Sequence, residues 1–277
     1  MTATHITSLQ NPRIKNIVKL HNRRQRDRQQ LTVVEGTREI GRALANGFIP
    51  REAYVCPDLA QSAEATAVID HLHQQIQTKL FTVTSDVFAK IAVRGESGGA
   101  LLLLPYWKRP LDSLPLSPIP FFLIVEGGEK PGNLGAILRT ADAAGVDAVI
   151  IADNENQRGT DLFNPNVVRA SLGALFTVPT VTAATKNLIP WLQEHTIQIG
   201  AATPTEDVLY TAVNLNQPLA LVLGSEAFGL SQRWLDAADL QMGIPMHGQI
   251  DSLNLSVATA VLLYEVVRQR GGRLNET

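Results

Sequence analysis

The stretch "EKPGNLGAILRTADAAG", from Glu129 to Gly145, is the first of three segments on which the fold assignment depends. Its small and aliphatic side chains recur at helical spacing, which predicts a buried helix over 133–145. Glycines and Asn133 crowd the start of this helix, and Arg139 lies among apolar neighbours. Taken alone, Asn133 is explained as an N-cap, and Arg139 as a salt-bridging or exposed flanking residue.

The sequence around this helix alternates between strands and helices. Near-continuous apolar runs such as "FFLIVEG" (121–127) and "DAVIIAD" (147–153) are typical of parallel strands covered on both faces. The pattern also predicts a helix near 164–173, a strand in "ALFTVPTV" and a long final helix over 252–270. The fold class is therefore α/β, and ligands are expected beyond the C-terminal ends of the strands.

Two further segments follow predicted strands in the same way. "LVLGSEAFGLS" (221–231) places Glu226 between two glycines directly after a buried strand. "IPMHGQIDSLNLSVATAVLLYE" (244–265) places three small polar residues where the last helix begins, which Asp251 or Ser252 is expected to cap. Each segment alone is explained by capping or by the helix dipole.

Together and in this order, the three segments resemble the motifs of the SpoU (TrmH-like) family of RNA ribose 2′-O-methyltransferases, in the SPOUT superfamily. The matching patterns are N-x-G-x-x-x-R-x-A at 133–141, G-S-E-A-F-G-L at 224–230 and I-P-M…S-L-N-L-S-V-A at 244–258. The resemblance covers about 119–270, and it implies a parallel sheet with a deep trefoil knot. Leu255 stands where the family usually has valine, which exchanges one apolar residue for another.

The resemblance also assigns roles to the polar residues of the three segments. It makes Arg139 the catalytic arginine, with Asn133, Glu226, Ser252 and Asn254 as supporting catalytic residues. Because a guanidinium holds its proton beyond about pH 12, we expect Arg139 to hold the RNA phosphate and stabilise developing alkoxide charge rather than act as a base. Glu226 is expected to orient Arg139 or a neighbouring amide.

The family's methyl donor is S-adenosyl-L-methionine, bound mostly by backbone groups of the knotted loops. In this sequence the matching positions offer apolar walls and exposed backbone, which suit an adenine ring. The expected cofactor-binding residues are Leu223, Gly224, Gly229, Ile244, Met246 and Leu253. The resemblance implies a homodimer formed through this domain, with both subunits shaping the active site.

The N-terminal half resembles, more loosely, the family's ribosomal-protein-like substrate-binding domain. Residues 1–30 carry seven Lys or Arg residues against one Asp, although the whole chain has a formal net charge of −2. A basic face of this kind, expected on a helix over 11–28, favours phosphate contacts but is also typical of a solvated helix. The expected RNA-binding residues are Arg13, Lys15, Arg23, Arg24 and Arg38.

The proline-rich segment "KRPLDSLPLSPIP" (108–120) separates the two halves. It predicts three parts: a smaller α/β RNA substrate-binding domain over 1–106, a stiff linker over 107–119 and a methyltransferase domain over 120–277. A single cysteine, a polar start and no apolar run long enough to span a bilayer favour a cytoplasmic protein without disulfides or membrane segments. The scattered histidines imply no metal site.

These features predict an enzyme that transfers a methyl group from S-adenosyl-L-methionine to a ribose 2′-hydroxyl. The accessory domain favours a structured substrate such as large-subunit (23S) ribosomal RNA, and so a role in rRNA processing. Two alternatives remain: a transfer-RNA ribose methyltransferase, and an rRNA-binding protein of the same fold that has lost catalysis. A nucleotide-dependent oxidoreductase lacks its G-x-G-x-x-G fingerprint.

Overall fold

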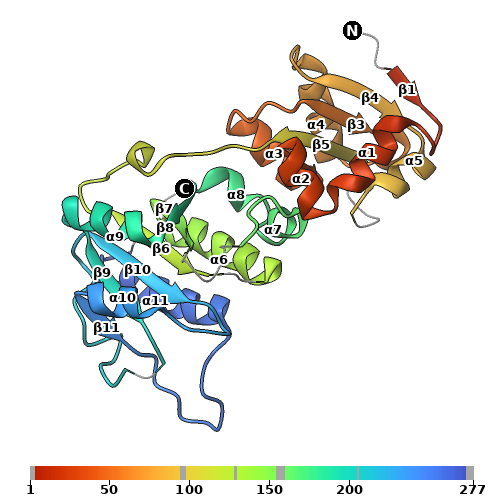
Figure 1. The fold of residues 1–277 in the computed structure, drawn as a ribbon. Coiled ribbons are helices and arrows are strands. Elements are labelled where there is room, and N and C mark those ends of the chain that lie inside the picture. The colour runs from red at the N-terminus through yellow and green to blue at the C-terminus, as the bar shows by residue number, and fades with distance from the viewer. Residues whose placement is uncertain (1–3, 94–97, 128–129, 154–159, 205, 273–277) are drawn as a thin grey trace. The chain divides into compact units, whose positions relative to one another are not determined.

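The computed structural model describes residues 4–93, 98–127, 130–153, 160–204 and 206–272. The chain forms two compact units (Figure 1). The first comprises Met1–Trp107 and Asp161–Thr177, and the second comprises Lys108–Thr160 and Val178–Thr277. The segment Asp161–Thr177 therefore packs with the N-terminal half, although the expected division at 107–119 assigns it to the C-terminal part.

The first unit is built on a mixed five-stranded sheet in the order β1-β4-β3-β5-β2. Its strands are β1 (Thr4–Ile6), β2 (Leu31–Glu35), β3 (Glu52–Val55), β4 (Lys79–Val83) and β5 (Ala100–Pro105). Strand β5 is antiparallel to both of its neighbours, and the other pairs are parallel. Its helices are α1 (Pro12–Leu20), α2 (Arg23–Gln29), α3 (Thr37–Ala45), α4 (Ala63–Gln74), α5 (Ser85–Ile91), α7 (Pro165–Ala170) and α8 (Ala174–Thr177).

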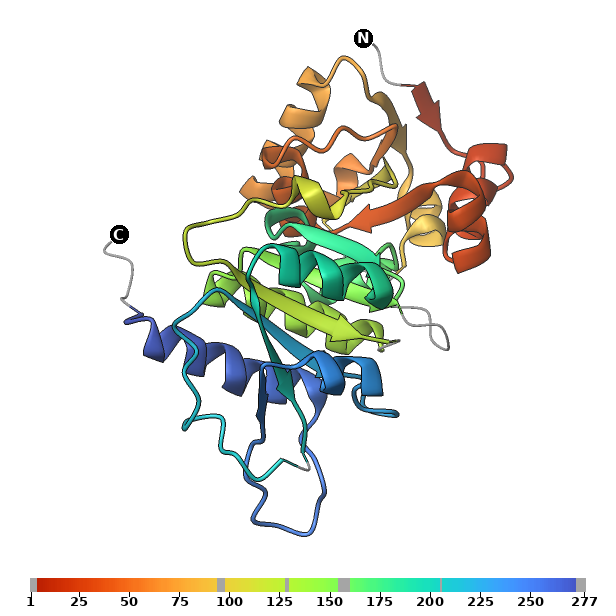
Figure 2. The ribbon, with the colours of Figure 1, turned by 60° about the vertical axis from the view of Figure 1, so that its left-hand side comes forward.

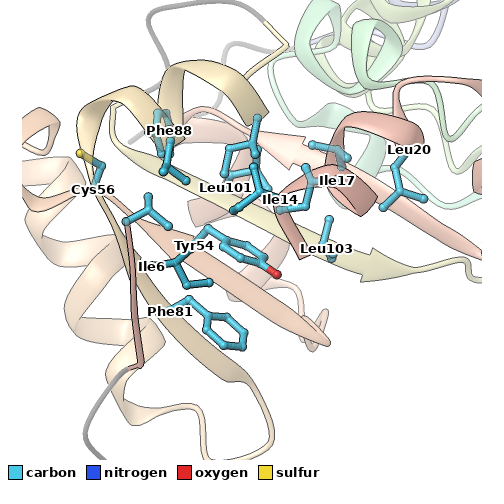
Figure 3. Close-up of a cluster of buried hydrophobic side chains, with 14 of the residues drawn as sticks. Ile6, Ile14, Ile17, Leu20, Tyr54, Cys56, Phe81, Phe88, Leu101 and Leu103 are labelled. Carbon is cyan, nitrogen blue, oxygen red and sulfur yellow. The ribbon is translucent and has the colours of Figure 1, made fainter. Parts of the chain in front are cut away.

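One face of this sheet packs on α1 and α5 through a continuous apolar cluster (Figure 3). The ring of Tyr54 from β3 stacks on Phe81 from β4, with ring centroids 5.1 Å apart. Ile14 and Ile17 enter the same cluster from α1. The expected basic helix over 11–28 is in fact two helices, because Asn22 caps a second helix by accepting a hydrogen bond from the Arg24 amide at 2.9 Å.

The second unit is built on a fully parallel six-stranded sheet in the order β11-β9-β10-β6-β7-β8. Its strands are β6 (Phe121–Glu126), β7 (Ala148–Asp153), β8 (Thr180–Ala184), β9 (Gln198–Ala202), β10 (Leu219–Gly224) and β11 (Leu240–Met242). Its helices are α6 (Pro131–Ala144), α9 (Thr185–Glu194), α10 (Gln232–Ala237) and α11 (Leu255–Gln269). The parallel sheet predicted from the apolar runs is confirmed.

Helices cover both faces of this sheet. Alternate side chains of β6, Phe122 and Ile124, share a cluster with Trp191 from α9 and Trp234 from α10. Because side chains alternate along a strand, the intervening residues face the opposite layer. There α11 packs against α6, and Figure 2 shows the loop that joins β11 to α11 extending away from the sheet.

One of the expected elements is wrong in detail. "ALFTVPTV" is not a single strand, since Ala174–Thr177 form α8 and β8 begins at Thr180. Here tertiary packing overrides the local sequence signal. The segment expected as a linker has contacts with the second unit: Leu114 is buried, and Asp112 accepts a 3.0 Å hydrogen bond from the Trp191 indole.

Candidate active site

The site lies at the carboxyl ends of β6 and β10. These neighbouring strands pair in register up to Glu126 and Gly224. The chain leaving β6 continues to β7 on one side, and the chain leaving β10 continues to β11 on the other. Open α/β sheets bind ligands where two adjacent connections diverge in this way.

Three polar side chains from the three sequence motifs meet at this edge. The amide of Asn133 in α6 donates to Glu226 Oε1 at 3.0 Å. The amide of Asn254 donates to the same oxygen at 2.7 Å and to Asn133 Oδ1 at 3.2 Å. The structure thus brings together residues up to 121 positions apart in the chain. Of the two partners expected for Glu226, Arg139 or a neighbouring amide, the described residues show the amides.

The start of α11 supplies the geometry of this cluster. Asn254 is the N-cap: its Oδ1 accepts from the Ser256 amide at 3.0 Å, and its NH₂ group points to Glu226. The Leu255 amide, one of the free N–H groups of the first turn, also donates to Glu226 Oε1, at 3.3 Å. A carboxylate at a helix N-terminus is stabilised by those amides and by the helix dipole.

The expected helix boundaries need correction here. Helix α11 begins at Leu255, so neither Asp251 nor Ser252 caps it, and Ser252 lies exposed in the preceding loop. Helix α6 begins at Pro131 behind the N-cap Lys130, so interpreting Asn133 as an N-cap is also wrong. Asn133 is instead a first-turn residue whose amide is directed to Glu226.

A tight turn carries Glu226. The Gly229 amide donates to the Ser225 carbonyl at 2.9 Å, and Gly229 adopts a positive φ of 65°. A Cβ atom on Gly224 would lie 2.0 Å from the Gly229 carbonyl carbon. Only glycine allows this close passage of backbone on backbone, which explains the residue type at position 224.

Glu126, which the sequence reasoning missed, fastens the far end of this turn. It is 1% exposed, and Oε2 accepts from the Ser231 amide at 2.7 Å. Its other oxygen accepts from the Ser231 hydroxyl at 2.8 Å and from the Thr185 hydroxyl at 3.5 Å. The signal available in the sequence was an acidic residue at the end of an otherwise apolar buried strand. A buried carboxylate needs hydrogen-bond donors, so such a residue indicates a structural contact.

A pocket of about 210 Å³ opens beside this cluster. All six residues expected to bind the cofactor line it, together with Glu226 and Ser252; the six are Leu223, Gly224, Gly229, Ile244, Met246 and Leu253. The Ser225 hydroxyl in its wall is buried and has no hydrogen-bond partner in the described part of the chain. Apolar walls, a glycine-lined backbone and a spare hydroxyl fit a nucleoside with a polar tail.

Arg139 does not join the cluster within one chain. It is exposed and makes no hydrogen bond or ion pair that the described residues show. It follows Asn133 by six residues in α6, which places it about 9 Å along the axis and about 120° around it. Lys130 is the cation at the cluster, with Nζ 3.8 Å from Glu226 Oε2.

The basic residues expected to bind RNA differ in their availability. Arg13 is ion-paired with Glu52 and lies over the Phe81 ring, and Arg23 is 3.6 Å from Asp27. Lys15, Arg24 and Arg38 are exposed. Arg26, counted in the basic face, is buried and paired with Asp161 within the first unit.

Other site types have no support in the part of the chain that is described. No group of three or more His, Cys, Asp or Glu residues there could hold a metal ion. No helix among residues 4–272, outside the gaps given above, is long and apolar enough to cross a membrane.

The parallel sheet, its divergent strand ends and the pocket beside Glu226 define an α/β protein with a ligand site at the carboxyl ends of its strands. Residues 120–264 match the SpoU rRNA Methylase family, and residues 11–101 match the MRM3-like substrate binding domain. Since the first match spans more than half of the chain, the protein belongs to the SpoU rRNA methylase family. It is an S-adenosyl-L-methionine-dependent RNA ribose 2′-O-methyltransferase.

Individual relatives agree with this assignment. The chain is 27% identical to the 23S rRNA (guanosine(2553)-2′-O)-methyltransferase RlmP of Bacillus subtilis, over 94% of this chain and 98% of that protein. It is 42% identical to the 23S rRNA (guanosine-2′-O-)-methyltransferase RlmB of Pectobacterium atrosepticum, over 58% of this chain and 64% of that one. An AdoMet-bound rRNA methyltransferase from Sinorhizobium meliloti superposes with a TM-score of 0.85 at 28% identity, covering 96% and 98% of the two chains.

Proposed function

We propose that the protein methylates a ribose 2′-hydroxyl in 23S ribosomal RNA. The observation that carries this proposal is the position of Glu226, which both lines the pocket and holds the amides of Asn133 and Asn254. The names of the relatives favour the large-subunit RNA as the substrate. When bound, S-adenosyl-L-methionine supplies an electrophilic methyl group on its sulfonium.

The chain's own residues position the attacking hydroxyl. Three donors converge on Glu226 Oε1, which fixes the carboxylate and the two amide side chains as one rigid unit at the pocket mouth. A positioned ribose then needs little further ordering before reaction. Arg139 holds a phosphate of the RNA through its planar fork and stabilises the developing alkoxide, while a phosphate oxygen or water accepts the proton.

The proposal extends to the architecture. The residues 1–106 serve as the RNA substrate-binding domain, with Lys15, Arg24 and Arg38 on phosphates, and residues 120–277 as the catalytic domain. Within the latter we infer a trefoil knot, as the resemblance of the three motifs to the SpoU family implies. The protein works as a cytoplasmic homodimer joined through α6 and α11, where Val257 and Tyr264 are about half exposed.

To test this, purified protein and labelled S-adenosyl-L-methionine are incubated with unmodified 23S RNA and, separately, with unmodified transfer RNA. We expect label in 23S RNA, at one nucleotide whose 2′-O-methyl group blocks alkaline cleavage. Label confined to transfer RNA would support the alternative substrate. Failure to bind S-adenosyl-L-methionine by calorimetry would support a catalytically inactive rRNA-binding protein.

A further inference from the structure

Phe228 is an apolar side chain held in solvent next to the catalytic cluster. Its side chain is 75% exposed, and Ile250, in the loop before α11, is 73% exposed. These are the two most exposed large apolar residues described in the second unit. Both lie two residues from a residue that lines the pocket, namely Glu226 and Ser252. Apolar exposure in that unit is therefore greatest in the two loops that wall the cofactor site.

The turn that carries Phe228 is fixed on both sides of this residue. Ser225 and Gly229 are bonded across it at 2.9 Å, and Ser231 is held by buried Glu126. Glu226, two residues earlier, is fixed by Asn133 and Asn254. These contacts fix the backbone on both sides of Phe228, and its exposed ring lies in the turn that carries Glu226.

We propose that Phe228 stacks on a nucleobase of the RNA, at or beside the nucleotide being methylated; this rests on the proposed function. The ribose must reach the pocket mouth, and its base and neighbouring bases lie within a few ångströms of it. Aromatic rings bind unstacked RNA bases regardless of their identity. The exposed Lys130, whose Nζ lies 3.8 Å from Glu226 Oε2, offsets the negative charge of that carboxylate, which would otherwise repel an RNA phosphate.

The test compares Phe228→Ala, Phe228→Leu and Phe228→Trp on unmodified 23S RNA transcript. Loss of one stacking contact, worth about 1–3 kcal/mol, lowers kcat/KM for RNA roughly 5- to 150-fold. We expect this loss in both the alanine and leucine variants, near-normal activity in the tryptophan variant, and an unchanged Kd for S-adenosyl-L-methionine. Leu116→Ala, in the linker and 49% exposed, is the control for an exposed apolar residue away from the site and should leave kcat/KM unchanged.

Two results would overturn the proposal. Full activity of Phe228→Leu would mean that apolar area, and not a ring face, is what matters. Conversion of the alanine variant to a monomer in sedimentation equilibrium would make Phe228 a contact between copies of the chain. An inactive wild-type protein would instead contradict the proposed function, so the two failures are distinguishable.

Discussion

Arg139 is the residue whose role depends most on what lies outside a single chain. Its guanidinium is exposed and has no partner in the described part of the molecule, so the fold does not use it structurally. We expect Arg139→Ala to lower the single-turnover rate by about 100-fold or more, as loss of an oxyanion-type donor does. Arg139→Lys should recover only part of this, since lysine lacks the planar fork.

The control for Arg139 is cofactor binding. Because Arg139 does not line the pocket, calorimetry should give both variants a wild-type Kd for S-adenosyl-L-methionine, and thermal melting should be unchanged. Near-normal turnover by Arg139→Ala would remove it from the reaction.

Glu265 provides a second prediction at the scale of one residue. Arg268 bonds its carboxylate at 2.7 and 2.8 Å, which holds the pKa of Glu265 below its usual value. Because the folded protein favours the charged form, this contribution to stability is present above the ordinary pKa of about 4.5 and is lost as the pH falls through the lower folded value. Urea midpoints between pH 3 and 7 should therefore fall more steeply at the acid end for the wild type than for Glu265→Gln. Parallel curves would show that Glu265 is not coupled to folding.

At the scale of elements, the turn between β10 and α10 depends on β6. Glu126→Ala leaves the part-buried Ser231 amide and hydroxyl without their acceptor, and the loss of these hydrogen bonds to a charged group costs about 1–3 kcal/mol. We expect it to lower the melting temperature and weaken S-adenosyl-L-methionine binding, because the turn walls the pocket. Ser231→Ala keeps the hydrogen bond from its backbone amide to Glu126, so we expect smaller losses of stability and of cofactor binding.

Thr185→Val is the matched control for Glu126, since it removes only the 3.5 Å contact. The Kd for S-adenosyl-L-methionine, measured by calorimetry, should then rise in the order Thr185→Val, Ser231→Ala, Glu126→Ala. Equal effects of all three would mean that the general packing of this region, and not the hold on Ser231, governs the pocket.

The sequence predicted elements better than their ends. Apolar periodicity located α6, α11 and the parallel strands, because those signals are local. It placed the start of α11 three residues early, since Ser252, Asn254 and Ser256 are all competent caps and only contact with Glu226 distinguishes Asn254. The family motifs named Asn133, Glu226 and Asn254 as a set, whereas Glu126 matched no motif.

At the scale of the whole molecule, the segment Asp161–Thr177 is what the sequence could not place. It follows β7 in the chain yet belongs to the first unit: Asp161 pairs with buried Arg26, and Phe163 stacks on Tyr106 with centroids 3.7 Å apart. These partners are more than 50 residues away, so no local pattern encodes them. Arg26 was counted in the basic RNA-binding face because its partner Asp161 is distant in the chain and cannot be inferred from the local sequence.

The separation of Arg139 from Glu226 within one chain leads to a prediction about the dimer. If the dimer forms through α6 and α11, Arg139 of one protomer can serve the Glu226 cluster of the other. Mixing Arg139→Ala with Glu226→Ala should then restore activity, because the heterodimer keeps one site with both residues intact. Random exchange of protomers in a twofold dimer gives about a quarter of the wild-type rate.

Each variant alone supplies the baseline, and the mixture must be refolded together so that protomers exchange. If both residues act in the same subunit, each site of the heterodimer lacks one of them and the mixture stays inactive. Sedimentation equilibrium on the mixture confirms that dimers have formed, so an inactive mixture of dimers would place Arg139 and Glu226 in one chain. That result would require α6 to shift when RNA binds, because its exposed Arg139 lies about 120° around the helix from Asn133.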